Sequence, residues 1–571
     1  MSANIAAAGT RRRPMTKEEK RVILASSAGT IFEWYDFYLY GSLAAVIGAQ
    51  FFSAFPEATR NVFALLAFAA GFLVRPFGAL VFGRLGDLVG RKYTFLMTIL
   101  IMGTSTFLVG LLPSYATIGW AAPIILIALR MLQGLALGGE YGGAVVYVAE
   151  HAPQDRRGYF TSWIQTTATL GLLMSLLIIL ATRTYLGEKE FAEWGWRVPF
   201  LLSIILLIIS VYIRLQMEES PAFMKMKEEG RHSKAPISEA FGQWKNAKFA
   251  VLALLGLVAG QAVVWYTGQF YALFFIQNVL RVDLLTSNVL IAWSLILGTG
   301  GFIFFGSLSD RIGRKVIILS GCLVAAVTYF PVFKYITETA NPALARAHQN
   351  TQVVVVADTN TCSFQFNPTG TSKFTSACDI AKATLARSSV NYSTEHKPGA
   401  IDAVIRVGDK EIPSYDAGKL TGDATKTVPA AFNKAIGEAL GAAGYPVPGA
   451  ANPEIVKTTG FFDIFRPQPL KLIAVLTFLV LLVTAVYGPI AAALVELFPT
   501  RIRYTGMSLP YHIGNGWFGG LLPASAFAMS AQTGDIYYGL WYPIVIAAGT
   551  LVIGAIFVPE NRNKDIFADD R

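Results

Sequence analysis

The stretch GRLGDLVGRK at Gly83–Lys92 recurs as GSLSDRIGRK at Gly306–Lys315, with six of ten positions identical at an offset of 223 residues. A second motif, a glutamate followed by a proline and an arginine, also occurs twice, at an offset of 346 residues. Its copies are Glu150, Pro153 and Arg157, and Glu496, Pro499 and Arg503. Self-similarity of this kind indicates two related halves. Because the offsets differ by 123 residues, one half carries an additional segment of about that size.

The composition is that of a membrane protein. Of the 571 residues, 54% are apolar and 15% are charged, and the mean hydropathy is +0.48. Soluble globular proteins have about 25% charged residues, so that class is excluded, as are disordered chains and small disulfide scaffolds. The net charge of +10 is explained by cytoplasmic loops rich in Lys and Arg rather than by nucleic-acid binding. We therefore expect contact with a lipid bilayer and no nucleic-acid partner.

Twelve apolar stretches are long enough to cross a bilayer, which takes about 20 helical residues. They are 22–50, 61–83, 93–112, 118–149, 159–182, 196–217, 249–279, 285–307, 315–336, 470–495, 504–530 and 536–558. With the N-terminus inside, the inside segments hold 26 Lys and Arg, and the short outside loops hold five. Positive charge concentrates in cytoplasmic loops, so both termini are expected in the cytoplasm.

This topology divides the chain into seven parts. They are a cytoplasmic N-tail (1–21), a first six-helix half (22–217), a cytoplasmic linker (218–248), spans seven to nine (249–336), an outside insertion (337–469), spans ten to twelve (470–558) and a cytoplasmic C-tail (559–571). The insertion is polar. Its residues 353–356 and 403–407 are typical of strands, and residues 429–443 are typical of a helix that Gly444 ends. We expect a small α/β fold there.

Two of the three cysteines, Cys362 and Cys378, lie in this insertion, and Cys322 lies in span nine. Since the outside of a cell is oxidising, a Cys362–Cys378 disulfide is predicted, with two buried free thiols as the alternative. No group of Cys and His has the spacing of a metal site, and no metal is expected.

Two six-helix halves in parallel repeat are the plan of the major facilitator fold, an all-α membrane fold of twelve helices with the solute between the halves. Further motifs narrow the resemblance. They are FEWYDFYLYG at 32–41, RPFG at 75–78, RMLQG at 130–134, GGEYGG at 138–143 and ELFPTRIRYTG at 496–506. With the repeated loop motif they resemble the metabolite:H+ symporter family of this superfamily. The resemblance covers all twelve spans but not the insertion.

This resemblance implies a transporter of the bacterial inner membrane whose insertion faces the periplasm. Members of the family import small organic acids such as α-ketoglutarate, shikimate and citrate, or zwitterions such as proline and betaine. The osmosensors of the family carry a long C-terminal coiled coil. Here the sequence after span twelve shows no heptads, which makes an osmosensor the weaker expectation.

Ionisable side chains inside a membrane cost about 2.5–3.5 kcal/mol on insertion scales and are functional candidates. Glu33 and Asp36 share one face of span one, and Arg130 lies at a similar depth in span four. A carboxylate facing an arginine keeps a low pKa, which rises when the arginine takes another partner. We hypothesise that a substrate carboxylate takes Arg130 and that Asp36 or Glu33 then binds the proton. The alternative is an ion pair that only locks span one to span four.

Three further residues of the first half are secondary candidates. We predict that Tyr35 and Arg75 bind the substrate. For Arg75 the alternative is a structural ion pair with an acid of the first half. Glu140 lies about 15 Å from Arg130 by helical rise, toward the cytoplasm. Pairing with a gate residue and contact with the substrate are equally consistent with its position.

The repeated loop motif supplies Asp87 and Arg91 in the first half, and Asp310 and Arg314 in the second. An acid at a helix end can pair with an arginine and with the positive N-terminus of a neighbouring helix. In the superfamily this arrangement latches the outward-open state, so a gating role is implied. Topogenic charge would explain the arginines, but not an aspartate repeated in both halves.

In the second half, Gln261, Trp265 and Gln269 fall on one helical stripe suited to lining a polar cavity. Anchoring at the membrane interface is the alternative for the tryptophan. We predict that His512 and Asn515 of span eleven bind the substrate, and a histidine can also shuttle protons. A helix–helix hydrogen bond is the alternative for this pair.

The sequence has no nucleophile elbow, zinc-protease motif or phosphate-binding loop, so an enzyme is not expected. We attribute the run Gly138–Gly143 to helix packing. The expected function is proton-coupled uptake of a small carboxylate, driven by the proton gradient without a cofactor. Uptake of a zwitterion or polyol is the second hypothesis. The third is a transporter-derived sensor whose insertion binds a ligand or a partner protein.

Overall fold

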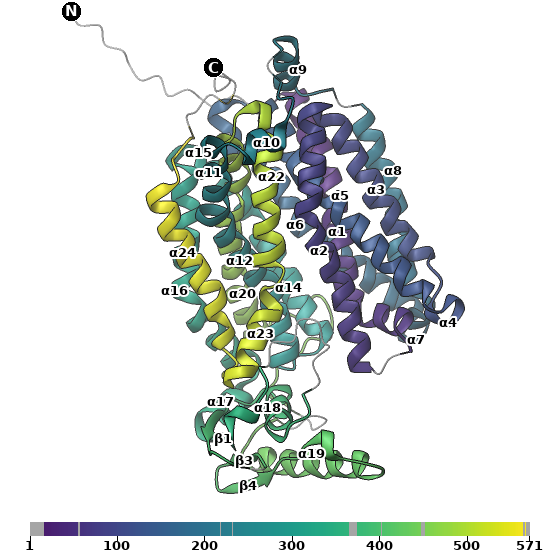
Figure 1. Cartoon of the computed structure of the whole chain (residues 1–571), viewed down its shortest axis with the longest axis vertical. Coiled ribbons are helices and arrows are strands. Elements are labelled where there is room, and N and C mark those ends of the chain that lie inside the picture. Colours follow the sequence, from purple (N-terminus) through teal and green to yellow (C-terminus); the bar gives the residue numbers. More distant parts are fainter. Residues whose placement is uncertain are drawn as a thin grey trace, which may run out of the picture.

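The computed structural model describes residues 16–54, 57–216, 218–230, 232–364, 374–400, 402–446, 452–562 and 566. Some side chains within the described helices are not described, among them that of Glu33. The helices form one bundle with a smaller lobe attached at one end (Figure 1). We call the end at which α1 (Lys17–Phe51) begins and α24 (Trp541–Phe557) ends the terminal end. The opposite end, which carries the lobe, is the insertion end.

The first half lies on the right in Figure 1. Within its described residues it has six long helices and two short ones. They are α1, α2 (Glu57–Leu88), α3 (Arg91–Leu111), α4 (Tyr115–Ile118), α5 (Ala121–His151), α6 (Arg157–Leu186), α7 (Glu188–Glu190) and α8 (Arg197–Leu215). Two short helices, α9 (Pro221–Glu228) and α10 (Pro236–Phe241), lie in the connection to the second half.

The second half begins with a long helix that π-helical segments interrupt. Its parts are α11 (Trp244–Ala253), η3 (Leu254–Val258), α12 (Ala259–Tyr266), η4 (Thr267–Tyr271), α13 (Ala272–Phe274) and η5 (Phe275–Val279). The other helices of this half are α14 (Leu284–Gly298), α15 (Gly300–Ile312), α16 (Arg314–Ala340), α20 (Pro467–Tyr487), α21 (Ile490–Leu497), α22 (Arg503–Ile513), the π-helical η9 (Gly514–Gly519), α23 (Leu522–Thr533) and α24.

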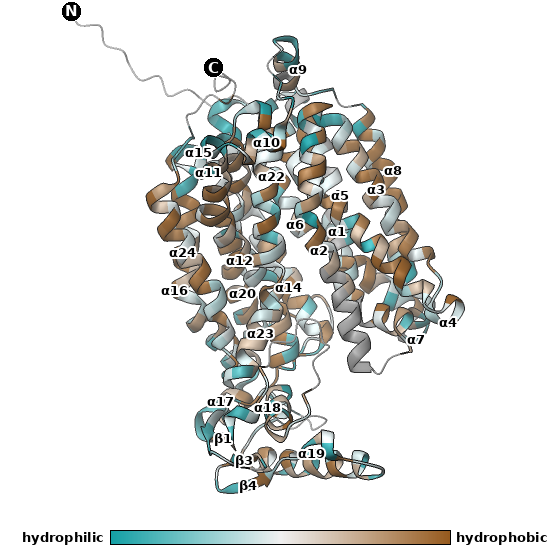
Figure 2. Ribbon diagram, in the orientation of Figure 1, coloured by the Kyte–Doolittle hydropathy of each residue, from teal (hydrophilic) through white to brown (hydrophobic). Residues whose placement is uncertain are grey.

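Apolar composition explains this architecture, because a chain inside a bilayer has to satisfy its backbone hydrogen bonds internally. Among the described residues, nine helices are long and apolar enough to cross a membrane. The other three predicted spans coincide with α1, α2 and the run from α22 to α23. Apolar residues, brown in Figure 2, follow the bundle, whereas polar residues gather at its ends and in the lobe. The halves face each other through α2 and α22 and through α6 and α15.

Glycines allow α2 and α5 to approach closely. A Cβ atom at Gly134 would lie 2.1 Å from the carbonyl oxygen of Gly71, and one at Gly138 would lie 2.3 Å from that of Arg75. A larger residue at either position would force the backbones apart. The glycine-rich run of α5 therefore serves helix packing.

The lobe between α16 and α20 is a small α/β domain, as predicted. Its elements are α17 (Pro342–Asn350), β1 (Val353–Ala357), α18 (Ala377–Arg387), β2 (Ser393–His396), β3 (Val404–Val407), β4 (Lys410–Pro413) and α19 (Ala424–Ala442). The strand order is β2-β1-β3-β4, with β1 parallel to β2 and the other pairs antiparallel. The apolar strand β1 is buried between β2 and β3. Its Val355 pairs with Thr394 of β2 on one side and with Ile405 of β3 on the other. The largely exposed strands β2 and β4 have no apolar alternation and were not predicted.

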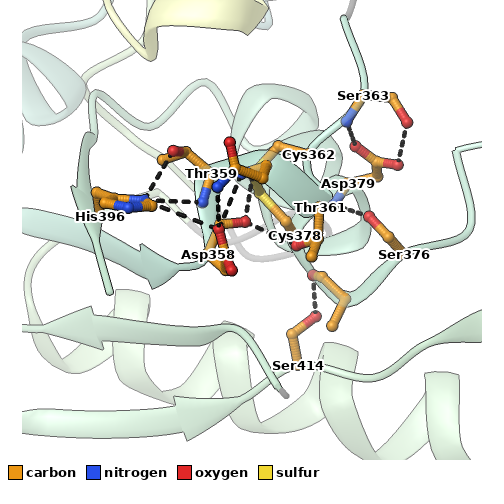
Figure 3. Close-up of a disulfide and its surroundings, with 12 residues drawn as sticks. Asp358, Thr359, Thr361, Cys362, Ser363, Ser376, Cys378, Asp379, His396 and Ser414 are labelled. Atoms are coloured by element: carbon orange, nitrogen blue, oxygen red, sulfur yellow. Dashed lines mark hydrogen bonds and ion pairs between the residues drawn. A yellow bond between two sulfur atoms is a disulfide. The ribbon is translucent and has the colours of Figure 1, made fainter. Parts of the chain in front are cut away.

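Cys362 and Cys378 form a disulfide with their Cα atoms 5.2 Å apart (Figure 3). It joins the chain that follows β1 to the first turn of α18. The carboxylate of Asp379 accepts hydrogen bonds from Ser363 N and Ser363 Oγ, each at 2.7 Å. The same two segments are therefore joined twice. Cys322 is a buried free thiol.

Candidate functional site

At the terminal end, a carboxylate of the first half caps a helix of the second. Asp87, at the end of α2, accepts hydrogen bonds from Thr505 N at 2.9 Å and from Thr505 Oγ1 at 2.7 Å. Asp87 also pairs with Arg91, whose Nη2 donates to the carbonyl of Thr500 at 3.0 Å. All four residues are buried. Negative charge is stabilised at a helix N-terminus, so Asp87 holds the start of α22 against α2.

Asp310 repeats this arrangement in the opposite direction. Its two carboxylate oxygens accept hydrogen bonds from Gly158 N and Tyr159 N at the start of α6, each at 2.8 Å. It also pairs with Arg314 at 2.5 Å. The loop motif that recurs in the sequence thus forms two reciprocal helix caps between the halves.

The second repeated motif exchanges ion pairs between the halves. Glu150 of α5 lies 2.9 Å from Arg503 of α22, and Glu496 of α21 lies 2.8 Å from Arg157 of α6. None of these four side chains is more than 4% exposed. Buried charges are tolerated only when they are paired in good geometry. We call these residues the terminal latch: Asp87, Arg91, Glu150, Arg157, Asp310, Arg314, Glu496 and Arg503.

At the insertion end, the two halves enclose a cavity of about 740 Å³. Its walls come from α1 and α6 of the first half, from η4, α13, η5 and α14 of the second, and from residues 459–461 of the insertion. Most of its lining residues are apolar, and Ser42, Gln269 and Asn288 are among the polar ones. A mostly apolar cavity with a few polar groups is typical of a site for a small molecule.

Aromatic side chains form the floor of this cavity. The hydroxyl of Tyr38 on α1 donates to Gln269 Oε1 in the other half at 3.0 Å, and its ring stacks on Phe270 with centroids 5.2 Å apart. One helical turn deeper, the rings of Trp34 and Trp265 have centroids 5.1 Å apart. Tyr38 and Phe270 line the cavity, and Trp34 and Trp265 pack against them. We call these four residues the aromatic floor. Gln269 and Phe270 lie in the π-helical segment η4, a type of distortion frequent at functional sites.

Below the aromatic floor the interface between the halves is closely packed. Tyr141 of α5 stacks on Tyr511 of α22 with centroids 3.7 Å apart. Next to it, within the second half, Gln261 and Asn515 exchange side-chain hydrogen bonds of 3.3 and 3.2 Å. His512 is buried here as well, at 1% exposed. The structure is thus accessible from the insertion end and closed from the floor to the terminal latch.

Of the predicted substrate-binding side chains, only Gln269 is part of the cavity wall, within the described residues. The predicted substrate-binding residues that are not among its lining residues are Tyr35, Arg75, Arg130, Gln261, Trp265, His512 and Asn515. Arg75 is buried with its guanidinium 4.5 Å from the ring centre of Phe72. Periodicity predicts which face of a helix points inward, but not the depth at which two halves separate. The deeper members of the predicted stripe therefore contact protein in this conformation.

Asp36 and Arg130 meet inside the first half. Arg130 Nη1 lies 3.5 Å from Asp36 Oδ2 and 2.5 Å from Gln133 Oε1. Gln133 Nε2 in turn donates to Asp36 Oδ1 at 3.3 Å and to Thr106 Oγ1 at 3.0 Å. Asp36 is 0% and Arg130 is 3% exposed. The predicted pair is therefore formed, whereas the side chain of Glu33 lies outside those that the structure describes.

Two predicted residues have partners that do not fit the predicted roles. The hydroxyl of Tyr35 donates to the carbonyl of Pro199 at 2.7 Å, so Tyr35 fastens α1 to α8 instead of facing the cavity. Glu140 pairs with Arg214 of α8 and accepts a hydrogen bond from Thr98 Oγ1 at 2.8 Å. All these residues belong to the first half, so the ion pair of Glu140 does not join the halves.

Tyr38, Gln133 and Arg214 are absent from the sequence-based predictions. Tyr38 lies two residues from Asp36 and so faces another side of α1, which marks it as a cavity candidate once Asp36 points inward. Gln133 follows Arg130 by three residues and shares its face. Arg214 carries no local signal, since its partner is 74 residues away.

Comparison with known proteins gives the following matches. The sequence profile of the family described as "Sugar (and other) transporter" matches residues 22–366. A proline/betaine transporter of Salmonella typhimurium is 36% identical over 328 residues, which make up 55% of this chain and 64% of the relative. A shikimate transporter of Escherichia coli is 35% identical over 326 residues, 55% of this chain and 72% of the relative. The chain thus matches just under two thirds of the length of the first relative.

Solved structures resemble nearly the whole chain. A double-tryptophan mutant of XylE matches with a TM-score of 0.59 at 13% identity, over 97% of this chain and 98% of XylE. The major facilitator protein XylE, a proton:xylose symporter, bound to 6-bromo-6-deoxy-D-glucose matches with a TM-score of 0.58 at 13% identity, over 96% and 98% of the two chains. At this identity the likeness concerns the fold. It confirms the architecture of two related halves.

Proposed function

Since this chain belongs to the sugar (and other) transporter family and has the major facilitator fold, we propose that it takes up a small carboxylate-bearing solute together with protons. The observation that carries the proposal is the asymmetry along the bundle. A cavity of about 740 Å³ is present at the insertion end, and the terminal latch closes the other end. Rocking of the halves would close the cavity at the insertion end and open the terminal end, which gives alternating access.

We place the terminal end in the cytoplasm of a bacterial cell and the insertion, residues 337–469, in the periplasm. The 26 Lys and Arg of the terminal-end segments, against five in the short loops at the other end, support this orientation. The disulfide of the insertion also fits the oxidising periplasm. In this orientation the conformation is open to the outside.

A small organic acid is the first solute that we propose. Proline, betaine and shikimate, which appear in the names of the relatives, all contain a carboxylate. In the cavity wall, Arg183 of α6 is a cation that can attract a carboxylate, and Ser42 and Asn288 are hydrogen-bond donors. The relatives' solutes differ in whether they also carry a positive charge.

A zwitterion is the second candidate, and the aromatic floor favours it. Quaternary ammonium groups bind to the faces of Trp and Tyr rings, and Tyr38 and Phe270 line the cavity directly. Asp283, in the wall formed by the second half, would attract the positive end of such a solute. Competition between solutes decides between the two candidates.

For the coupling we propose Asp36 as the proton acceptor, with Glu33 as the alternative, and Arg130 as its counter-ion. Arg130 is 3% exposed and is held by Asp36 and Gln133. This burial supports a counter-ion role in the outward-open state over direct contact with the solute. Protonation of Asp36 would remove the attraction between α1 and α5, which gives the proton a means of biasing the conformation.

The test is uptake of labelled α-ketoglutarate, shikimate, proline and betaine into proteoliposomes with an acidic outside, with and without a protonophore. Accumulation that the protonophore abolishes would support proton-coupled uptake. Competition by shikimate and citrate, but not by betaine, would select the organic acid, and the reverse would select the zwitterion. Saturable binding of a solute without any flux would instead support the sensor hypothesis and overturn transport.

A further inference from the structure

The insertion is attached to the second half of the bundle. Tyr392 N donates to the carbonyl of Gly534 at 2.9 Å, and Ile536 N donates to Asn391 Oδ1 at 3.0 Å. Val456 N donates to the carbonyl of Ala340 at the end of α16 at 2.8 Å. Across the described part of the chain, the hydrogen bonds that dock the insertion on the bundle end on the second half. When the halves rock, the insertion therefore moves with the second half.

The last part of the insertion is fixed to α14. We call residues 458–461 the entrance segment. Thr458 N donates to Thr286 Oγ1 at 2.8 Å, and the indole nitrogen of Trp293 donates to the carbonyl of Phe461 at 2.7 Å. The rings of Trp293 and Phe461 also stack, with centroids 5.2 Å apart. Thr459 is held as well, since its backbone nitrogen donates to Asp463 at 2.8 Å. These contacts hold the entrance segment in one position on α14.

Three residues of this segment, Thr459, Gly460 and Phe461, line the same cavity as Tyr38 and Gln269. The insertion thus contributes to the wall of the candidate solute site itself. A Cβ atom built at Gly460 would meet no atom within 4 Å. Side chains at this position can therefore extend into open space without displacing the backbone.

We propose that the entrance segment is a specificity-determining wall of the solute path, which limits the size of the molecules that reach the aromatic floor. This proposal rests on the proposed transport function. The opposite wall is α6 of the first half, with Arg183 and Thr184 among the lining residues. Because the insertion follows the second half, the distance between the entrance segment and α6 changes as the halves rock. A solute therefore passes the insertion before the cavity closes around it.

The test enlarges residue 460 in three steps, Gly460→Ala, Gly460→Leu and Gly460→Trp. The readout is the labelling rate of Ser42→Cys, a cavity position, by a membrane-impermeant thiol reagent. The native cysteines interfere little, since Cys322 is buried and the other two form the disulfide. The matched control is Gly549→Trp on α24, where a Cβ also meets no atom within 4 Å. We expect labelling to slow as the side chain at residue 460 grows, most of all for tryptophan, and no change in the control.

Uptake measurements on the residue-460 and Gly549 variants with Ser42 retained separate this inference from the proposed function. If transport occurs, Gly460→Trp should raise KM most for the bulkiest solute, with Gly549→Trp unchanged. Labelling rates and KM values equal to those of the control would overturn the role of the entrance segment while transport stands. Slower labelling in a protein without any uptake would support the entrance segment and overturn the transport proposal.

Discussion

Asp36 Oδ2 of α1 and Nη1 of Arg130 on α5 lie 3.5 Å apart, and both side chains are buried within the first half. The pair does not face the cavity, whose wall on α1 is formed by Tyr38, Gly41 and Ser42. A solute above the aromatic floor is thus separated from the proposed proton acceptor by α1 itself. Coupling between the two would act through the position of α1 rather than through direct contact.

The first prediction concerns this pair. Asp36→Asn keeps the shape of the side chain but cannot exchange a proton, so uptake driven by a pH gradient should be lost. Solute exchange at equal concentrations should persist, because exchange needs no net proton transfer. Both activities are measured in proteoliposomes. Asp36→Asn also leaves Arg130 buried without its counter-charge, which costs about 3–5 kcal/mol, so the melting temperature should fall.

The control for stability is the double variant Asp36→Asn/Arg130→Gln, which removes both charges and should recover much of the lost melting temperature. Glu33→Gln distinguishes the two acids of α1. If Glu33→Gln abolishes gradient-driven uptake and Asp36→Asn does not, the proton acceptor is Glu33. Full gradient-driven uptake in both single variants would contradict the coupling mechanism.

The second prediction concerns the terminal latch. Asp87→Ala removes the carboxylate that accepts from Thr505 N and Thr505 Oγ1. Loss of a helix cap costs about 0.5–2 kcal/mol, which corresponds to a shift of about 2- to 30-fold toward the state open at the terminal end. The readout is the thiol labelling of Ser508→Cys, which is 0% exposed in α22. Labelling should accelerate by a similar factor.

Asp310→Ala removes the mirror-image cap on Gly158 and Tyr159 and should have the same effect. The matched control is Asp155→Ala, which removes an exposed acid at the same end of the bundle. Equal labelling rates of Ser508→Cys in all three variants would show that the caps do not hold this end closed.

The latch is also the part of the site that sequence reasoning predicts best. Asp87 and Asp310 occupy the same position of a repeated motif, and an acid at a helix end has few uses other than a cap or an ion pair. The ion pairs of Glu150 with Arg503 and of Glu496 with Arg157 were not predicted, although all four residues belong to the second repeated motif. The two copies of the loop motif thus correspond to two reciprocal helix caps at the interface between the halves.

The cavity is harder to predict, because its position depends on the conformation in which the halves meet. Gln261, Trp265 and Gln269 form one stripe, yet only Gln269 of the three lines the cavity in the described structure. Trp265 packs on Trp34 of the first half, and Gln261 bonds to Asn515 within its own half. Tyr35 illustrates a second limit, since its partner is a backbone carbonyl at Pro199, 164 residues away. Contacts that depend on the packing of distant helices leave no spacing signal in a single sequence.

The third prediction concerns the disulfide of the insertion. Cys362 and Cys378 are separated by 16 residues, and closing a loop of about 15 residues stabilises a fold by about 3 kcal/mol in the chain-entropy model. Reduction, or the double variant Cys362→Ser/Cys378→Ser, should therefore increase hydrogen exchange in β1 and α18 of the full-length protein. Reductant should have no further effect on the double variant. Unchanged exchange after verified reduction would contradict the prediction.

The fourth prediction concerns the pH dependence of the insertion, through His348 of α17. Burial lowers the pKa of His348 below its usual value of 6.5, and this effect outweighs the hydrogen bond to the Ser389 carbonyl and the attraction of Asp535, which both raise the pKa. The ring also packs near Tyr445, with centroids 5.7 Å apart. As the pH falls below 6.5, the unfolded segment binds a proton before the folded one does.

Stability of the α17 region is therefore fully present above pH 6.5 and declines as the pH falls toward the lowered pKa of His348. Protection of α17 and β1 against hydrogen exchange, corrected for the intrinsic rates, should decrease from pH 7.5 to 5.5 by at most about tenfold per pH unit. His348→Gln should remove this dependence. His396→Gln, which changes a side chain that is 44% exposed, should leave the dependence intact. If His348→Gln and the wild-type protein lose protection equally at low pH, another group controls the stability of the insertion.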